Sequence, residues 1–160
     1  MPTQLLDRLA PDVLYAPEQD MWVRFEPDGT AKIGATHLVA SHGQFMLFTP
    51  RPVGTEVLLD RSLGVMETAK TAVAVHAPLS CRIIEINTSV VDNIHFVITD
   101  PYGAGWLLRV QPTAVEGERD ALMDCVAYRA WVEPRLGEKL KAPIDDFGED
   151  DLKVDPHQGY

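Results

Sequence analysis

The sequence predicts a mainly β protein with a short N-terminal helix and a C-terminal helix. The chain has 160 residues, 46% of them hydrophobic, which is enough to bury one sizeable core. Short apolar runs, separated by residues that favour turns, occupy most of the chain, as in compact β sandwiches and barrels. After about residue 116 the apolar residues follow three- and four-residue steps, the spacing of a helix that packs on one side.

The N-terminal helix is expected within the first ten residues. Thr3 can cap its start, and Leu5, Leu6 and Leu9 give it an apolar side. Pro11 has no backbone N–H and therefore discourages continuation of the helix.

Strands are expected at residues 21–25, 31–35, 45–48, 54–59, 82–87, 95–98 and 106–110. The first two are joined by Pro27-Asp28-Gly29-Thr30, which combines residues typical of a tight turn. Residues 45–48 are apolar at every position, which predicts a strand buried on both faces inside a sandwich.

The C-terminal helix is expected between about residues 116 and 133, with Pro134 ending it. One side can dock on the sheet through residues at helical spacing, which are Leu122, Cys125, Val126, Arg129 and Val132. We therefore expect one domain over residues 1–134. Residues 135–160 form a tail rich in Pro, Gly and acids, which is either solvated or a docking strip that uses Phe147.

The net charge of −10 argues against binding to nucleic acid or to an anionic membrane surface, because both need a basic patch. No apolar run is long enough to span a bilayer, and the N-terminus lacks the pattern of a secretory signal, so we expect a cytoplasmic location. Cys81 and Cys125 do not have the spacing of metal ligands, and we expect no metal. We also expect a monomer.

Residues 64–80 are the most informative stretch of the chain. They read as an apolar strand, a short polar turn and a second apolar strand, with Lys70 in the turn. A lysine at the tip of a tight hairpin is held clear of the protein surface. No group beside it suggests direct catalysis, so we expect Lys70 to be presented to other proteins.

This hairpin resembles the lipoyl attachment hairpin of the glycine cleavage H protein family. That family's Glu-Ser-Val-Lys corresponds here to Glu67-Thr68-Ala69-Lys70, and its Ala-Pro-x-Ser-Gly to Ala77-Pro78-Leu79-Ser80-Cys81. The resemblance runs from about residue 15 to residue 131 and includes Tyr15-Ala16-Pro17 before Trp22 and Asp100-Pro101-Tyr102-Gly103. Biotin carriers share the hairpin but place methionine on both sides of the lysine, which Ala69 and Thr71 do not match. An ordinary exposed turn lysine is the other alternative.

The resemblance implies a barrel-sandwich hybrid lipoyl domain with lipoic acid attached to Lys70 as N6-lipoyl-lysine. Such a protein is a carrier and not an enzyme by itself, because the cofactor provides the reactive chemistry. Glu67 is then either read by the attaching enzyme or only keeps the turn solvated.

Three positions depart from the family's pattern. The family shelters a cationic adduct of the arm with two acids, whose positions are Met21 and Ala74 here, although Asp20 could replace the first acid if the register shifts by one. These two residues imply an apolar resting surface for the arm. Cys81 replaces a glycine and is either a small buried side chain or a thiol that exchanges with the arm.

At these positions the sequence resembles the H-like lipoate-binding proteins of cytoplasmic sulfur oxidation, in which the arm carries sulfur-bound intermediates. This reading implies three partners: a lipoate–protein ligase, a heterodisulfide-reductase-like complex and dihydrolipoamide dehydrogenase. Two alternatives stay open: a glycine cleavage H protein that carries an aminomethyl group, and an unlipoylated binding or regulatory module.

Overall fold

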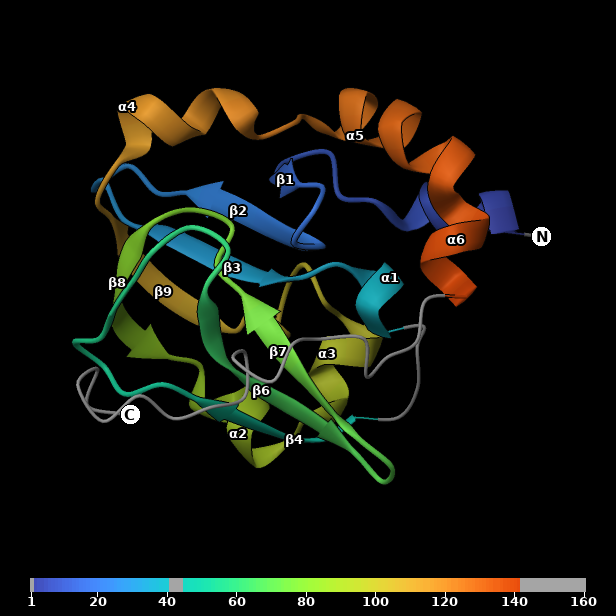
Figure 1. Ribbon diagram of the computed structural model, residues 1–160. Helices are drawn as coiled ribbons and strands as arrows, with labels where there is room; N and C mark the ends of the chain where they lie inside the picture. Colours follow the sequence, from blue (N-terminus) through green and yellow to red (C-terminus); the bar gives the residue numbers. More distant parts are fainter. Residues whose placement is uncertain (1, 41–44, 142–160) are drawn as a thin grey trace.

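The computed structural model describes residues 2–40 and 45–141 and has the expected mainly β architecture (Figure 1). A six-stranded antiparallel sheet has the order β1-β2-β3-β9-β8-β5, and a three-stranded sheet has the order β4-β6-β7. The strands are β1 (Leu14–Ala16), β2 (Met21–Phe25), β3 (Ala31–Ala35), β4 (Phe45–Pro50), β5 (Glu56–Val57), β6 (Ser62–Thr68), β7 (Ala72–His76), β8 (Cys81–Ile86) and β9 (Leu108–Pro112).

Helical segments connect and cover the strands in the part of the chain that the structure describes. The α-helices are α1 (His37–Ala40), α2 (Thr88–Asp92), α3 (His95–Thr99), α4 (Val115–Glu118), α5 (Cys125–Val132) and α6 (Leu136–Lys141). Three 3₁₀ turns are η1 (Pro2–Arg8), η2 (Arg119–Ala121) and η3 (Glu133–Arg135). The N-terminal helix is therefore present as a 3₁₀ segment.

The main core contains side chains from both sheets. Val23 and Ile33 of the six-stranded sheet share one buried cluster with Phe48, Met66 and Val75 of the three-stranded sheet. Because strand residues alternate between faces, β3 of the six-stranded sheet contributes every second side chain to this cluster, namely Ala31, Ile33 and Ala35. The core fixes the three-stranded sheet against the larger one.

A second, aromatic cluster joins both ends of the described chain to the six-stranded sheet. Tyr15 of β1 stacks on Tyr128 of α5 with ring centroids 4.4 Å apart. Trp22 is fully buried in the same cluster, and its indole N–H donates to the carbonyl of Pro101 at 3.0 Å. In Figure 1, α4 and α5 pass over β1 and β2, so this cluster lies beneath the C-terminal helical region.

The expectation of a strand at residues 95–98 is wrong, because these residues begin α3. The Asn93 side chain accepts a hydrogen bond from the backbone N–H of His95, which helps to start the helix. Only Val97 of this short helix is buried. A four-residue apolar run cannot distinguish a strand from a buried helical turn. Two other expected strands are shifted or shortened: β9 begins at Leu108, and β5 contains only Glu56 and Val57.

The prediction that residues 45–48 are buried on both faces is also wrong. Phe45 and Phe48 point into the core, but Met46 is 64% exposed and Leu47 is 43% exposed. The pairing of β4 with β6 shifts register between Phe45 and Leu47, so Met46 is an extra residue in β4. A β-bulge of this kind lets two consecutive side chains face the same side of the sheet.

The C-terminal helix is interrupted, unlike the continuous helix expected from residue 116. Between η2 and α5 the backbone is extended, and Met123 exchanges two hydrogen bonds with Tyr15 of β1. Asp124 then caps α5 by accepting from the backbone N–H of Ala127 at 2.8 Å. The face of α5 that packs inward carries Tyr128 and Val132.

One residue of the expected docking face, Val126, points away from the fold, because the helix begins only at residue 125 and presents Tyr128 and Val132 inward. Cys125 is half-buried and packs against the aromatic cluster. Pro134 does not end the helical region either, since it occupies the first turn of η3, where no intrahelical N–H bond is needed.

Helix α6 lies beyond residue 134, where the tail was expected to begin. Leu136 is buried in the aromatic cluster. The Lys139 ammonium donates to Asp20 at 2.6 Å and to the carbonyl of Pro17 at 3.2 Å. These contacts hold α6 to the turn before β2. Phe147 and the acidic residues around it lie outside the described residues.

Candidate functional site

The hairpin of β6 and β7 places Lys70 in its turn. The two strands pair in antiparallel register, with Met66 opposite Val73 and Glu67 opposite Ala72. In Figure 1 the turn between β6 and β7 projects beyond the rest of the three-stranded sheet. The predicted hairpin is therefore present, and Lys70 is exposed at its tip.

Thr68 holds the turn together. Its backbone N–H donates to the carbonyl of Thr71 at 2.8 Å, closing the four-residue turn. Its hydroxyl oxygen accepts from the backbone N–H groups of Lys70 and Thr71 at 3.3 and 3.2 Å. Three backbone and side-chain contacts from one threonine thus fix the backbone of Lys70 without involving its side chain.

The base of the hairpin depends on a glycine. Gly64 has φ of +155°, and a Cβ at this position would lie 2.5 Å from the carbonyl oxygen of Thr49 and 2.7 Å from the Cα of Pro50. The Ser62 hydroxyl accepts from the Gly64 N–H at 3.2 Å. This close approach lets β4 pair with β6 at Pro50 and Gly64, and so supports the hairpin from one side.

The Lys70 side chain suits covalent attachment of a carboxylic acid. It is exposed, and among the described residues it has no side-chain hydrogen bond or ion pair. An amide at its Nζ would therefore break no contact within the described structure and would leave the fold unchanged. Glu67 is also exposed, one strand position before the turn.

Met21 and Ala74 lie in different sheets and are both covered. Met21 begins β2 opposite Ala35 and is 2% exposed, and Ala74 lies in β7 opposite Val65 and is 5% exposed. A lipoyl arm could reach either side chain only if the residues above it moved. Their role as a resting surface stays a prediction.

Asp20, the possible substitute for the first missing acid, is engaged by a cation. Its carboxylate receives the 2.6 Å hydrogen bond from Lys139, and its backbone adopts φ of +56° in the turn before β2. A cationic group that approached Asp20 would compete with the Lys139 ammonium. The structure thus gives this carboxylate a structural partner that the sequence pattern did not reveal.

The two cysteines are in different environments. Cys81 begins β8 and is buried, and burial, with a smaller contribution from the nearby Glu118, raises the pKa of its thiol to about 12. A thiol with that pKa is almost entirely protonated at neutral pH, which slows thiol–disulfide exchange. Exchange of Cys81 with the arm stays a prediction. Burial also raises the pKa of Cys125, which is half-buried at the start of α5.

A buried histidine network, not indicated by the sequence, ties η1 to the fold. The His37 ring contacts the hydroxyl of Tyr102 at 2.7 Å through Nδ1 and the carbonyl of Leu5 through Nε2. Because a carbonyl can only accept, Nε2 carries the proton and Nδ1 accepts from Tyr102. Burial lowers the pKa of His37 to about 4, so the ring is neutral at physiological pH.

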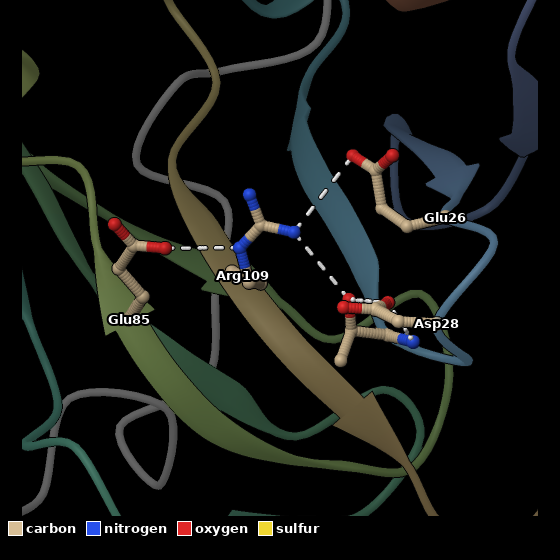
Figure 2. Close-up of polar contacts among 5 residues, drawn as sticks. Glu26, Asp28, Glu85 and Arg109 are labelled. Atoms are coloured by element: carbon tan, nitrogen blue, oxygen red, sulfur yellow. Dashed lines mark hydrogen bonds and ion pairs between the residues drawn. The ribbon is translucent and has the colours of Figure 1, made fainter.

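An arginine-centred cluster lies on the six-stranded sheet and joins strands β8 and β9 to the turn between β2 and β3 (Figure 2). The Arg109 guanidinium contacts Glu85 at 2.9 Å, Glu26 at 3.9 Å and the Thr30 hydroxyl at 3.4 Å. Thr30 in turn donates to Asp28 through its hydroxyl and its backbone N–H, which lowers the pKa of that carboxyl. The cluster belongs to the sheet that does not carry Lys70, and its contacts connect the β2–β3 turn to β9 and β8.

Within residues 2–40 and 45–141 the structure contains neither a metal-binding cluster nor a membrane-spanning helix. No group of three or more His, Cys, Asp or Glu side chains there is placed to hold a metal ion. None of the described helices is both long and apolar enough to cross a membrane.

Comparison with known proteins decides the family. The family model described as "Glycine cleavage H-protein" matches residues 13–135, most of the chain. The chain belongs to the glycine cleavage H-protein family. A glycine cleavage system H protein from Halorhodospira halophila is 37% identical over 128 residues, covering 79% of this chain and 97% of that protein. Glycine cleavage system H protein 3 from Aquifex aeolicus is 33% identical, covering 85% of this chain and 82% of that protein.

The H-protein fold is also found in a solved structure. The crystal structure of a glycine cleavage system H protein from Mycobacterium marinum matches with a TM-score of 0.68 and 35% sequence identity, covering 78% of this chain and 99% of that chain. H proteins of this family are lipoyl carriers with a lipoyl group attached covalently to a lysine. The predicted family, fold class and lipoic acid cofactor are thereby confirmed.

Proposed function

We propose that Lys70 is the lipoylated lysine and that the chain is the mobile carrier of a glycine cleavage system. The observation that carries this proposal is the exposed lysine in a tight hairpin turn, in a chain that belongs to the H-protein family. The carried group is then an aminomethyl unit. The glycine cleavage names of the relatives from H. halophila and A. aeolicus support this choice.

Three residues of the hairpin have roles in presenting the arm. Thr68 fixes the turn, Gly64 lets β4 support β6, and Lys70 provides the attachment nitrogen at the most projecting point. When bound, the lipoyl group supplies a dithiolane that opens to two thiols on reduction and can carry a group on sulfur. The protein contributes position and reach, and no acid or base catalyst of its own.

The proposal includes the partners that such a carrier needs. A lipoate–protein ligase would attach the cofactor, a glycine decarboxylase would load it, and dihydrolipoamide dehydrogenase would reoxidise it. A cytoplasmic location and a monomeric state are part of the same proposal.

A second candidate is a carrier in sulfur oxidation, which the sequence pattern favours but none of the reported relatives supports. Its specific support is that Met21 and Ala74 are apolar and that Asp20 is paired with Lys139. A cationic aminomethyl arm would find little compensating charge at these three positions. In this alternative the partner would be a heterodisulfide-reductase-like complex.

One experiment separates the two candidates. Lipoylated protein is incubated with glycine and a glycine decarboxylase, and its intact mass is measured, with an established H protein as positive control and Lys70→Arg as negative control. A mass gain corresponding to aminomethylation in the wild-type chain supports the glycine cleavage function. No gain, while the positive control charges normally, rejects it and favours sulfur chemistry.

A further inference from the structure

Two adjacent apolar side chains on β4 are exposed beside the hairpin that carries Lys70. Met46 is 64% exposed and Leu47 43% exposed, because the bulge in β4 turns both away from the core. Exposure alone does not mark a binding surface, since Val53 and Leu58 are 57% and 69% exposed in the segment between β4 and β6. What distinguishes Met46 and Leu47 is their position.

The strand register places this pair next to the turn. Phe45 is opposite Thr68 and Leu47 is opposite Glu67, so Met46 and Leu47 lie beside the last two residues of β6. Residues opposite each other on antiparallel strands project to the same face, which makes the exposed Glu67 carboxylate a neighbour of Leu47. The result is a continuous exposed surface of Met46, Leu47 and Glu67, which we name the β4 patch.

We propose that the β4 patch is the docking surface for the enzyme that attaches the lipoyl group to Lys70. The inference builds on the proposed function, since it requires Lys70 to be acylated. It goes further by assigning two residues of another strand to recognition by the ligase.

We assign the patch to the attaching enzyme because the lysine side chain reaches only a short distance before it is modified. An unmodified lysine side chain is short, and its backbone is fixed by Thr68, so Nζ can enter an active site only if the enzyme approaches the hairpin closely. Such an approach brings the enzyme close to the neighbouring strand β4, which pairs with β6 as far as Thr68. An enzyme that acts on the end of a completed arm can stay farther from the protein surface. The β4 patch therefore suits the attaching enzyme better than the enzymes that use the arm.

The chemistry of the patch indicates what the ligase must present. Met46 and Leu47 require a complementary apolar surface, and Glu67 requires a cationic side chain at its rim. The net charge of −10 favours approach of such a basic surface. In the reaction itself, Lys70 Nζ attacks the carbonyl carbon of lipoyl adenylate, the carbon–oxygen bond to AMP breaks, and the nitrogen loses a proton.

The test compares apolar-to-polar variants of the β4 patch with a matched control. Initial rates of lipoylation by a purified bacterial lipoate–protein ligase, with ATP and lipoate, are followed by intact mass for wild type, Met46→Ser/Leu47→Ser and Val53→Ser/Leu58→Ser. We expect kcat/KM to fall about tenfold in the β4 variant, mainly through KM, and to stay unchanged in the control. Thermal unfolding confirms folding, and Met46→Gln is the milder substitute if the double variant is unstable.

A competition experiment measures docking to the ligase separately from acylation of the lysine. The Lys70→Arg chain cannot be acylated and serves as a competitive inhibitor of wild-type lipoylation. The same chain with Met46→Ser and Leu47→Ser should inhibit about tenfold more weakly. Equal inhibition constants, or equal rate losses in the β4 and control variants, would overturn the docking inference alone. Absence of wild-type lipoylation by an active ligase would overturn the proposed function and the inference together.

Discussion

The two sheets of the molecule are stabilised in different ways. The six-stranded sheet is covered on one face by the main core and elsewhere by the aromatic cluster, in which Tyr15 and Tyr128 stack. The three-stranded sheet is packed on the main core through Phe48 and Met66, but its turn projects and its strand β4 exposes Met46 and Leu47. The difference indicates that stability is concentrated in the larger sheet, while the smaller one presents Lys70 in its projecting turn.

The strongest test of this comparison is removal of the largest buried side chain of the aromatic cluster. Trp22→Ala should lower the free energy of unfolding by about 4 kcal/mol, because it leaves a cavity and an unpaired Pro101 carbonyl. Lys70→Ala should change it by less than about 0.5 kcal/mol. Urea denaturation measures both. Similar losses in the two variants would show that the hairpin tip is not energetically separate from the fold.

Within the smaller sheet, the base of the hairpin should be the one place where a single substitution costs much stability. Gly64→Ala should cost about 3 kcal/mol, since its Cβ would collide with the backbone of Thr49 and Pro50 at a positive φ. Gly29→Ala is a matched control, because Gly29 has φ of +90° with no atom within 4 Å of its Cβ position, and it should cost about 1 kcal/mol. Equal losses in chemical denaturation would mean that the close approach of β4 contributes nothing.

The stability of the region around the larger sheet should also depend on pH, through His37 of α1. Its folded-state pKa of about 4 lies below its ordinary value of 6.5, so the unfolded chain takes up the proton first as the pH falls. This stabilisation is complete above pH 6.5 and is lost toward pH 4. The wild-type chain should be about 2 kcal/mol less stable at pH 5 than at pH 8 through this group. Chemical denaturation at a series of pH values measures this loss. If the free energy of unfolding of His37→Gln depended on pH as steeply as that of the wild type, the prediction would be refuted.

The smallest expected effect is in the turn itself. Thr68→Ala removes the hydroxyl contacts to Lys70 and Thr71 and should cost about 1 kcal/mol, while Thr68→Ser should retain most of the stability. Amide hydrogen exchange at Lys70 and Thr71 should be faster in the alanine variant alone. Unchanged exchange would show that Thr68 does not fix the backbone of the lysine.

Local features of the sequence were enough to predict the hairpin. The turn residues, the flanking apolar runs and the motif around Lys70 lie within a short stretch, and their geometry is fixed by pairing of neighbours in the chain. The exposure of Met46 and Leu47 could not be predicted, because a bulge depends on how β4 pairs with β6 and not on its own composition.

The polar networks were also beyond the reach of sequence reasoning. His37 and Tyr102 are 65 positions apart, and no spacing rule connects them. Arg109 meets Glu26 and Glu85 only because β9 lies between β3 and β8. Such contacts follow from sheet topology. The same holds for the Lys139–Asp20 pair, which formed in a region expected to be a tail.

The central claim is that the hairpin turn presents Lys70 as the lipoyl attachment site. The most direct test is coexpression with a lipoate–protein ligase and lipoate, followed by intact mass and peptide mapping of the wild-type and Lys70→Arg chains. A single lipoyl group on Lys70, absent from the variant, is the predicted result. An unmodified wild-type chain, or modification of another lysine, would contradict the account and favour an unlipoylated binding module or a different attachment site.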